Sequence, residues 1–258
     1  MKISAVINTY NAAEYLERVL ESVKGFDEIL ICDMHSTDGT LGIVEKFGCR
    51  VVFHEHTGIV EPARAFAISQ ASHEWVLVVD ADEIVPDALR EYLYDHINRP
   101  DASEGLFIPR KNYLMGRFMH CAYPDHILRF MKRDKVEWPA RIHATPIIDG
   151  RVDTIPGKRK ELAFIHLANE PLKVTVNKMN TYTEMEMKRR KERNYGWGAL
   201  LFHPAVRFFR FYIIKGGFRD GKAGFIWAKE YAYYKFMTIA KVIESKITPD
   251  QWDNDLKP

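Results

Sequence analysis

The sequence predicts an α/β protein with a Rossmann-like, mainly parallel sheet flanked by helices. Short apolar runs begin near residues 3, 28, 50 and 75, and stretches with apolar residues at helical spacing lie between them. These starts are 25, 22 and 25 residues apart, which is the spacing of consecutive βαβ units. Polar residues follow the runs, as expected where the carboxyl ends of parallel strands form a ligand site.

Each element of this half follows from its own pattern. Tyr15, Leu16, Val19, Leu20 and Val23 recur at helical spacing, and we expect Asn11 to cap their helix and Gly25 to end it. The predicted elements, in chain order, are strands over 3–7 and 28–32, a helix over 41–47, a strand over 50–53, a helix over 63–71 and a strand over 75–79.

The last of these strands ends in three carboxylates within four residues, Asp80, Asp82 and Glu83. Asp80 and Asp82 are two positions apart, so on an extended backbone their side chains share one side. Two such carboxylates repel each other unless a cation or hydrogen-bond donors lie between them. A divalent ion that carries a substrate diphosphate would meet this need. A solvated acidic turn fits the same residues.

Composition places the chain among globular proteins with one large domain and an appendage. The chain has 258 residues, of which 47% are hydrophobic, and a net charge of only +2. Residues 171–246 hold 16 Lys/Arg and 6 Asp/Glu, a net +10, so the remainder is acidic. We therefore predict a domain over 1–170 and a basic, aromatic helical extension over 171–258.

The sequence argues against several classes of protein. Three scattered cysteines fit a reducing compartment rather than a disulfide framework or a zinc site. No run is long enough for a transmembrane helix and no signal peptide is recognised, so we expect a cytoplasmic protein. Neither a glycine-rich dinucleotide fingerprint nor a P-loop is present.

Four ordered motifs over about 85 residues resemble family 2 glycosyltransferases, which have the nucleotide-sugar-binding GT-A fold. The motifs are Thr9-Tyr10-Asn11, Asp33 with Ser36-Thr37-Asp38-Gly39-Thr40, Ala63-Arg64-Ala65-Phe66-Ala67, and Val79-Asp80-Ala81-Asp82-Glu83. The resemblance implies that Thr9, Asn11, Asp33 and Arg64 hold the nucleotide, with Asp33 near the base. Asp80 would face the ribose and the metal, and Asp82 would ligate the metal directly.

The middle of the chain resembles a subgroup that builds lipopolysaccharide core, capsule and exopolysaccharide. There a Tyr-Pro-Asp block, here Tyr123-Pro124-Asp125, precedes a His-Glu pair, but His143 is followed by Ala144. An inverting transfer needs a carboxylate base, and the resemblance favours Asp125, with Glu83 as the second candidate. Arg129 could pair with diphosphate oxygens or bridge a structural carboxylate. With the resemblance, His143 is a candidate third metal ligand or diphosphate contact. A helix cap is the alternative for Asp125.

The basic tail predicts helices over 174–195 and 224–244, with an apolar, basic run over 205–215 between them. Eleven residues cannot span a bilayer, but they could lie in the interface with their cations toward anionic headgroups. The alternatives are packing on the main domain or a homo-oligomer interface. No motif points to nucleic acid.

These observations predict an inverting glycosyltransferase that uses Mn2+ or Mg2+. Its expected donor is a nucleotide sugar, a UDP-sugar in particular, and its acceptor a growing glycan or lipid-linked glycan. It would be cytoplasmic, and peripheral on the inner face of the cytoplasmic membrane if the tail contacts lipid. A nucleotidyltransferase, or an inactive glycan- or membrane-binding scaffold of the same fold, is the alternative.

Overall fold

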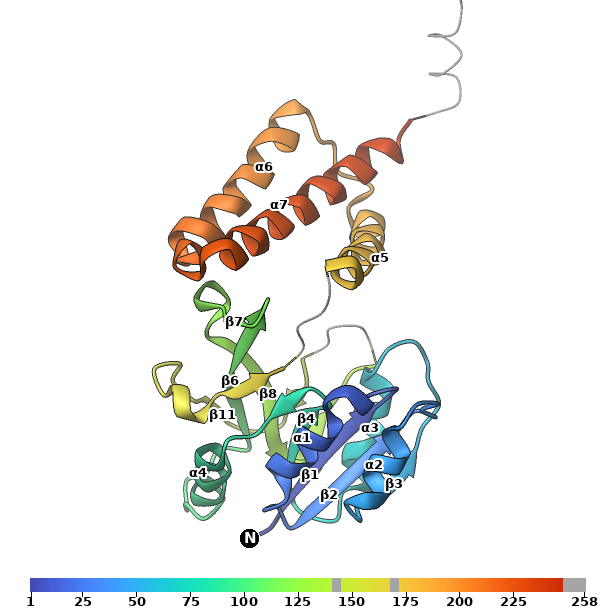
Figure 1. The fold of residues 1–258 in the computed structure, drawn as a ribbon, viewed down its shortest axis with the longest axis vertical. Coiled ribbons are helices and arrows are strands. Elements are labelled where there is room, and N and C mark those ends of the chain that lie inside the picture. The colour runs from blue at the N-terminus through green and yellow to red at the C-terminus, as the bar shows by residue number, and fades with distance from the viewer. Residues whose placement is uncertain (141–144, 168–171, 248–258) are drawn as a thin grey trace, which may run out of the picture. The chain divides into compact units, whose positions relative to one another are not determined.

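The computed structural model describes residues 1–140, 145–167 and 172–247. The chain divides into two compact units (Figure 1). Among the described residues, the sheet unit comprises 1–112, 123–140 and 145–167, and the helical unit comprises 113–122 and 172–247. The domain boundary expected after residue 170 falls outside the described residues. The segment 113–122 precedes that boundary but belongs to the helical unit.

Four parallel strands open the sheet unit, as the apolar runs predict. They are β1 (Ile3–Thr9), β2 (Glu28–Asp33), β3 (Arg50–Phe53) and β4 (Trp75–Asp80), and their order in the sheet is β3-β2-β1-β4. The connecting helices are α1 (Ala13–Val23), α2 (Thr40–Lys46) and α3 (Glu61–Gln70). Each strand starts at the residue where its apolar run starts, so the βαβ spacing is confirmed.

Both antiparallel and parallel pairing extend the sheet beyond β4. The strand β8 (Asp125–Lys132) runs antiparallel to β4 and to β6 (Gly105–Leu114). The strand β12 (Phe164–His166) then lies between β6 and the short β5 (Glu83–Ile84). The pairing of β12 with β5 brings a segment more than 80 positions away back to the acidic turn after β4.

The remaining elements of the sheet unit are short, apart from one helix. They are α4 (Asp87–Ile97), β9 (Val136–Glu137), β10 (Ile147–Ile148), β11 (Val152–Thr154), and the 3-10 turns η2 (Arg133–Lys135) and η3 (Lys160–Leu162).

Apolar side chains cover both faces of the sheet. Ile3, Ala5 and Ile7 of β1 belong to one core cluster, and Val6 belongs to the other. On the first face α1 buries Leu16, Val19, Leu20 and Val23 without exposed surface. Burial of each such side chain contributes roughly 1.5–3 kcal/mol. Because both faces are covered, the strands are apolar throughout rather than alternating.

Asn11 does not cap α1, contrary to the expectation. The N-cap residue is Ala12, with no side-chain cap hydrogen bond. Asn11 has a φ of 49°, a left-handed conformation that Asn tolerates better than most residues. Its Oδ1 instead accepts the N–H of Thr37 at 2.8 Å. Asn11 therefore links the loops that follow β1 and β2.

The helical unit is built mainly from three helices. They are α5 (Leu172–Arg190), α6 (Trp197–Phe209) and α7 (Gly221–Glu244), and a π-helical turn η4 (Arg210–Ile214) and a 3-10 turn η5 (Gly217–Asp220) join α6 to α7. The segment 113–122 adds the end of β6, β7 (Arg117–Phe118) and the 3-10 turn η1 (His120–Ala122). In the described part of the chain, no helix is both long and apolar enough to cross a membrane.

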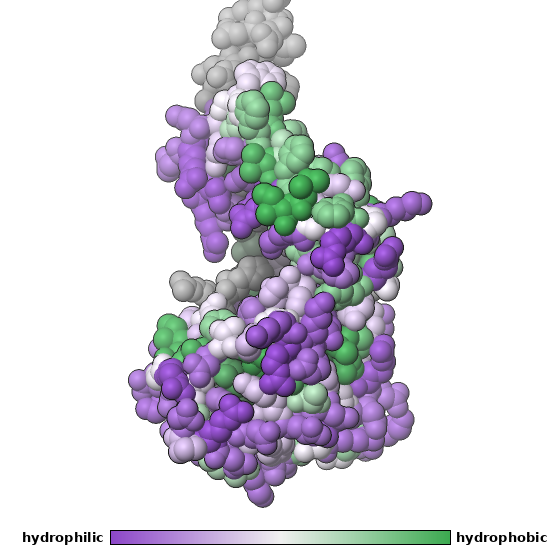
Figure 2. All heavy atoms as spheres, turned by 90° about the vertical axis from the view of Figure 1, so that its left-hand side faces the viewer, coloured by the Kyte–Doolittle hydropathy of each residue, from purple (hydrophilic) through white to green (hydrophobic). Residues whose placement is uncertain are grey.

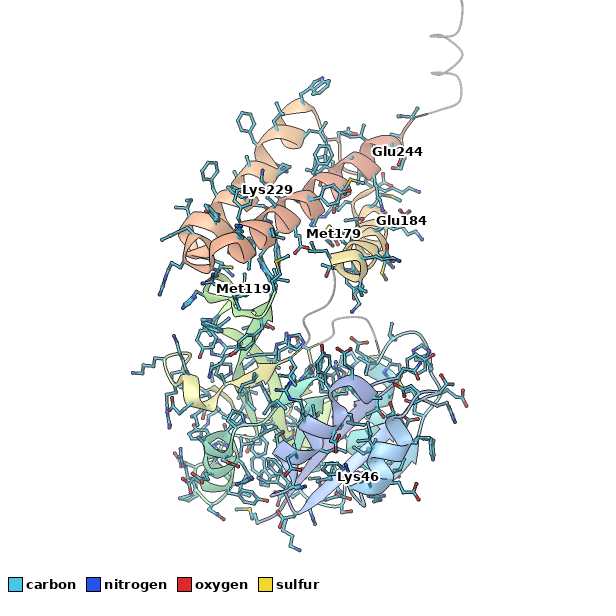
Figure 3. All side chains as sticks on the ribbon, viewed as in Figure 1. Lys46, Met119, Met179, Glu184, Lys229 and Glu244 are labelled. Carbon is cyan, nitrogen blue, oxygen red and sulfur yellow. The ribbon has the colours of Figure 1, made fainter. Side chains whose placement is uncertain are left out.

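Specific contacts hold these helices together, among the side chains that Figure 3 draws on α5, α6 and α7. The Lys241 ammonium of α7 lies 3.3 Å from Glu184 of α5 and donates to Asn180. The buried carboxylate of Asp220 accepts the backbone N–H of Cys121 at 3.1 Å and lies 2.6 Å from His120 Nδ1. Asp220 therefore ties the segment 113–122 to the start of α7.

The turn between α6 and α7 depends on a glycine at the start of α7. A Cβ added to Gly224 would lie 1.9 Å from the Gly217 carbonyl oxygen, whereas a Cβ on Gly198 would meet nothing closer than 3.8 Å. We expect Gly224→Ala to lower the free energy of unfolding of the helical unit by about 1–3 kcal/mol, because the backbone must shift. Gly198→Ala is the matched control and should leave the melting temperature unchanged or raised. Equal melting temperatures for the two variants would contradict this account.

Candidate functional site

The sheet register places the carboxyl ends of neighbouring strands at one level. Thr9 is aligned with Asp33 across β1 and β2, and Asn8 is aligned with Asp80 across β1 and β4. Polar residues at these strand ends therefore gather at one edge of the sheet. They form two groups, one at β1 and β2 and the other around β4, β8, β6 and β12.

In the first group, Asp33 is fully buried and its carboxylate is held from within the protein. Its Oδ2 accepts from Thr9 Oγ1 at 2.8 Å and from Ser36 Oγ at 2.6 Å. Its Oδ1 accepts the backbone N–H of Ser36 at 2.8 Å. Thr9 is also fully buried. Thr9 and Asp33 therefore fix the positions of the two loops after their strands, and Asn11, which is exposed, adds the contact to Thr37.

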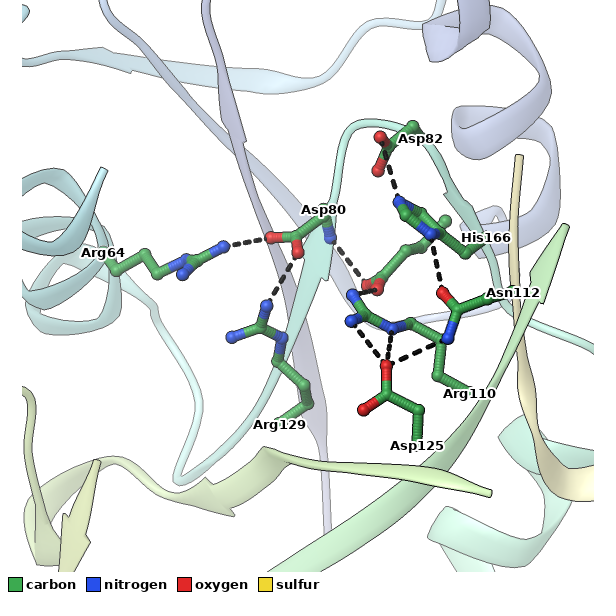
Figure 4. Close-up of polar contacts among 9 residues, drawn as sticks. Arg64, Asp80, Asp82, Arg110, Asn112, Asp125, Arg129 and His166 are labelled. Atoms are coloured by element: carbon green, nitrogen blue, oxygen red, sulfur yellow. Dashed lines mark hydrogen bonds and ion pairs between the residues drawn. The ribbon is translucent and has the colours of Figure 1, made fainter. Parts of the chain in front are cut away.

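The second group centres on Asp80, the last residue of β4 (Figure 4). Its Oδ1 is paired with Arg64 of α3, and its Oδ2 accepts from Arg129 Nη2 of β8 at 2.7 Å. Burial raises the pKa of this carboxyl, but the charges of Arg129, Arg64 and Arg110 outweigh it and hold the pKa well below its usual range. Asp80 is therefore a fixed anion between two guanidinium groups.

Trp138 holds the two arginines on their other side. The Arg64 and Arg129 guanidinium carbons lie 5.3 and 5.6 Å from its ring, within the range of a cation–π contact. Trp138 is itself buried, so its ring packs in the interior of the sheet unit. Both arginines use only Nη2 to bind Asp80, so each retains further N–H donors for another anion.

Glu83 is fully buried behind Asp80. Its Oε1 accepts from Arg110 Nη1 at 2.9 Å, and its Oε2 accepts the backbone N–H of Asp80 at 3.1 Å. Burial and the negative charge of Asp80 raise the pKa of Glu83 against the opposing effect of Arg129 and Arg110. Both oxygens of Glu83 are therefore engaged, and no part of its side chain reaches solvent.

Asp125 shares the same arginine but remains accessible. Its Oδ2 accepts from Arg110 Nε at 3.0 Å, from Arg110 Nη2 at 2.7 Å and from Asn112 Nδ2 at 3.0 Å. Burial raises the pKa of Asp125, and the charge of Arg110 with these hydrogen bonds lowers it overall. Its side chain is 36% exposed. Asp125 begins β8, so the alternative of a helix cap at this position is wrong.

Asp82 points away from Asp80 and faces His166, the last residue of β12 (Figure 4). The His166 Nε2 lies 3.3 Å from Asp82 Oδ2, and its Nδ1 lies 2.9 Å from Asn112 Oδ1. A hydrogen bond from Nδ1 to the Asn112 carbonyl orients the ring so that Nε2 faces Asp82. Burial lowers the pKa of His166, but the hydrogen bond and charge of Asp82 raise it overall.

This pair fits a divalent ion only in part. Two adjacent ligands of an octahedral ion are roughly 3 Å apart at metal–oxygen distances near 2.1 Å, and Asp82 and His166 meet that separation. Among the described residues, no group of three or more His, Cys, Asp and Glu side chains is arranged to hold a metal ion. Asp80 is occupied by its two arginines. An ion here would therefore take oxygen ligands from a substrate diphosphate or water, as Mg2+ commonly does.

The structure brings together most of the residues that the sequence singled out. Those around Asp80 are Arg64, Asp82, Glu83, Asp125 and Arg129, whereas Thr9, Asn11 and Asp33 form the separate group at β1 and β2. His143 lies outside the described residues. No sequence motif singled out Arg110, Asn112 and His166, although Phe164-Ile165-His166 repeats the pattern of an apolar strand that ends in a polar residue.

Comparison with known proteins points to one family. Residues 4–218 match the family model described as glycosyl transferase family 2. The chain is similar to "Lipopolysaccharide core biosynthesis glycosyltransferase LpsC" of Rhizobium meliloti (strain 1021). The two are 28% identical over 258 residues, which cover 95% of this chain and 93% of the relative.

Solved structures of glycosyltransferases resemble this one more distantly. S. aureus TarS 1–349 in complex with UDP has a TM-score of 0.49 and 18% identity, over 95% of this chain and 91% of that chain. The mannosyltransferase PcManGT from Pyrobaculum calidifontis, in complex with GDP-Man and Mn2+, has a TM-score of 0.48 and 17% identity, over 98% of this chain and 78% of that chain.

The pairing of His166 with Asp82 predicts a measurable pH dependence. In the metal-free protein we expect the pKa of His166 to lie above the unperturbed value near 6.5. The stabilisation that this pairing provides is then complete below about pH 6.5 and is lost as the pH rises through the raised value. The variant Asp82→Asn should lower the pKa of His166 in an NMR titration of the ring protons. An unchanged pKa in that variant would contradict the pairing.

Proposed function

The chain belongs to glycosyltransferase family 2, and from that premise we propose that it is an inverting, metal-dependent enzyme. It would transfer a hexose or related sugar from a nucleotide sugar, a UDP-sugar in particular, to a growing glycan or lipid-linked glycan of the cell surface. The proposal rests on one observation: three features lie at the same edge of the sheet. They are two arginines held by Asp80, the Asp82–His166 pair, and the accessible carboxylate of Asp125.

The nucleotide would lie over the loops after β1 and β2. Asp33 has no exposed surface and accepts three internal hydrogen bonds, so we propose that it shapes the nucleoside site by ordering these loops. The resemblance implied that Asp33 holds the nucleotide near its base, and in this proposal it does so through the loops. The loop after β1, in which Asn11 is exposed, would contact the nucleoside.

The diphosphate would be bound by Arg64 and Arg129. Asp80 and Trp138 fix both guanidinium groups, and their remaining N–H donors match phosphate oxygens in geometry and charge. Because the arginines are already positioned, little side-chain freedom is lost when the diphosphate binds.

Asp82 and His166 would hold the divalent ion, Mn2+ or Mg2+. Such an ion would neutralise negative charge on the departing diphosphate. In this proposal Asp80 acts through its arginines rather than as a metal ligand.

Asp125 would act as the general base. It takes the proton of the acceptor hydroxyl while that oxygen bonds to the anomeric carbon, and the bond from the same carbon to the diphosphate breaks. The low pKa of Asp125 keeps it ionised at neutral pH, and all its described hydrogen bonds go to Oδ2, which leaves Oδ1 for the proton. Glu83 fits this role less well, because it is buried and both of its oxygens are engaged.

Replacement of the base should separate chemistry from binding. We expect Asp125→Asn to lower kcat by roughly 10²–10⁴ and to leave the calorimetric affinity for UDP unchanged. Asp153→Asn, an exposed carboxylate of the same unit, is the control and should keep full activity. If Asp125→Asn retains transfer, the base is another group, and Glu83→Gln then becomes the variant to assay.

The metal role has its own test. We expect Asp82→Ala to abolish the part of UDP affinity that depends on Mn2+ or Mg2+, because it removes a ligand of the ion. Calorimetric titration of UDP with metal and with chelator measures that part directly. An unchanged metal-dependent affinity would remove Asp82 from the metal site. Metal-dependent hydrolysis of a UDP-sugar by the unaltered protein would exclude an inactive scaffold.

A further inference from the structure

The helix α6 and the turn η4 carry large apolar side chains on two opposite sides. On the inner side, Phe208 packs against Phe225 of α7 with ring centroids 5.5 Å apart, and Phe211 stacks on Tyr231 at 4.0 Å. These contacts account for one apolar side of α6. They leave the other side without an explanation.

The outer face of α6, defined here as Phe202, Val206, Phe209 and Ile213, has the spacing of one side of a helix. These four side chains are 67%, 63%, 59% and 50% exposed. Trp197, Leu201 and Ile214 on the same segment are 81%, 64% and 79% exposed. Figure 2 shows apolar side chains gathered over the helical unit on the side where α6 lies.

Such a stripe normally faces the core of a soluble protein. A helix that is apolar all round is buried by some partner, and a large exposed apolar patch rimmed by polar residues marks a binding surface. No helix in the described part of the chain can cross a bilayer. α6 itself has 13 residues, fewer than the roughly 20 that a spanning helix needs, so a lipid partner would receive it lying in the plane of the membrane surface.

The charges along residues 197–219 favour an anionic partner. Residues 197–219 contain Arg207, Arg210, Lys215 and Arg219 and no Asp or Glu. Arg210, Lys215 and Arg219 are exposed. An apolar face on a segment whose charged side chains are all cations matches an anionic lipid surface, in which acyl chains lie beneath phosphate headgroups. A symmetric pairing with a second copy would bring two sets of these cations together, which disfavours that occupant.

We propose that the outer face of α6 inserts into the headgroup region of an anionic bilayer. Phe202, Val206, Phe209 and Ile213 enter the boundary with the acyl chains, and Arg210, Lys215 and Arg219 pair with lipid phosphates. This surface extends the expected membrane contact to named residues, and it does not depend on the assignment of the sugar-transfer site.

Vesicle co-sedimentation of the full chain tests the proposal. We expect binding to vesicles of phosphatidylglycerol and phosphatidylcholine in equal parts, and at least about tenfold weaker binding to phosphatidylcholine alone. The double variant Phe202→Ser/Phe209→Ser should lose most of this binding by removing buried apolar area. The double variant Arg210→Gln/Lys215→Gln should lose binding and its sensitivity to salt. Ile147→Ser/Val176→Ser, which changes two exposed apolar residues outside α6, is the matched control.

Two further measurements make the outcome decisive. Melting temperatures confirm that the variants are folded, and calorimetric UDP affinity should be equal in all of them, which separates this proposal from that on sugar transfer. The proposal is overturned if the unaltered protein ignores anionic vesicles, or if Phe202→Ser/Phe209→Ser binds them as well as the control. It is also overturned if light scattering shows that the unaltered protein is a dimer, and that Phe202→Ser/Phe209→Ser alone dissociates this dimer while its binding to vesicles is unchanged.

Discussion

The pairing of the Asp80 carboxylate with two arginines is the interaction on which the edge of the sheet depends. It joins α3, β4 and β8 through Arg64, Asp80 and Arg129, and the ring of Trp138 supports both guanidinium groups. Loss of one partner from a buried ion pair costs about 3–5 kcal/mol, because the remaining charge is uncompensated. The same arrangement turns two flexible cations into a fixed anion site. In the proposed function, the stability of this edge and the binding of the diphosphate therefore have one physical origin.

Arg110 gives two nearby carboxylates opposite properties. Glu83 is buried behind Asp80, and its pKa is raised by burial and by that neighbouring charge. Asp125 is partly exposed, and the charge of Arg110 with its hydrogen bonds lowers its pKa. Their environments, more than their residue types, thus assign them to different roles. A carboxylate that stays ionised and accessible suits the base of an inverting transfer, whereas Glu83 suits the anchoring of Arg110 and of the turn after β4.

The sequence predicted the parallel half of the fold well, because apolar runs and their spacing are local signals. The strand starts at residues 3, 28, 50 and 75 all agree with the structure. The role of Arg110 and the approach of His166 to Asp82 arise from pairing among β6, β8, β12 and β5, which no local pattern encodes. The prediction that Asn11 caps a helix was wrong for a related reason. A contact to the loop after β2, which no local pattern encodes, holds that residue instead. The tail pattern indicated an apolar, basic segment, but only the structure showed which side of α6 is left exposed.

We propose that the edge of the sheet around Asp80 binds and activates a nucleotide sugar. The most direct measurement is the release of nucleoside diphosphate from a panel of UDP- and GDP-sugars by the unaltered protein, with Mn2+ or Mg2+ and with chelator. The account predicts slow, metal-dependent release of UDP from at least one UDP-sugar, through transfer to water when no acceptor is present. Absence of both release and binding across the panel, with metal present, would contradict it.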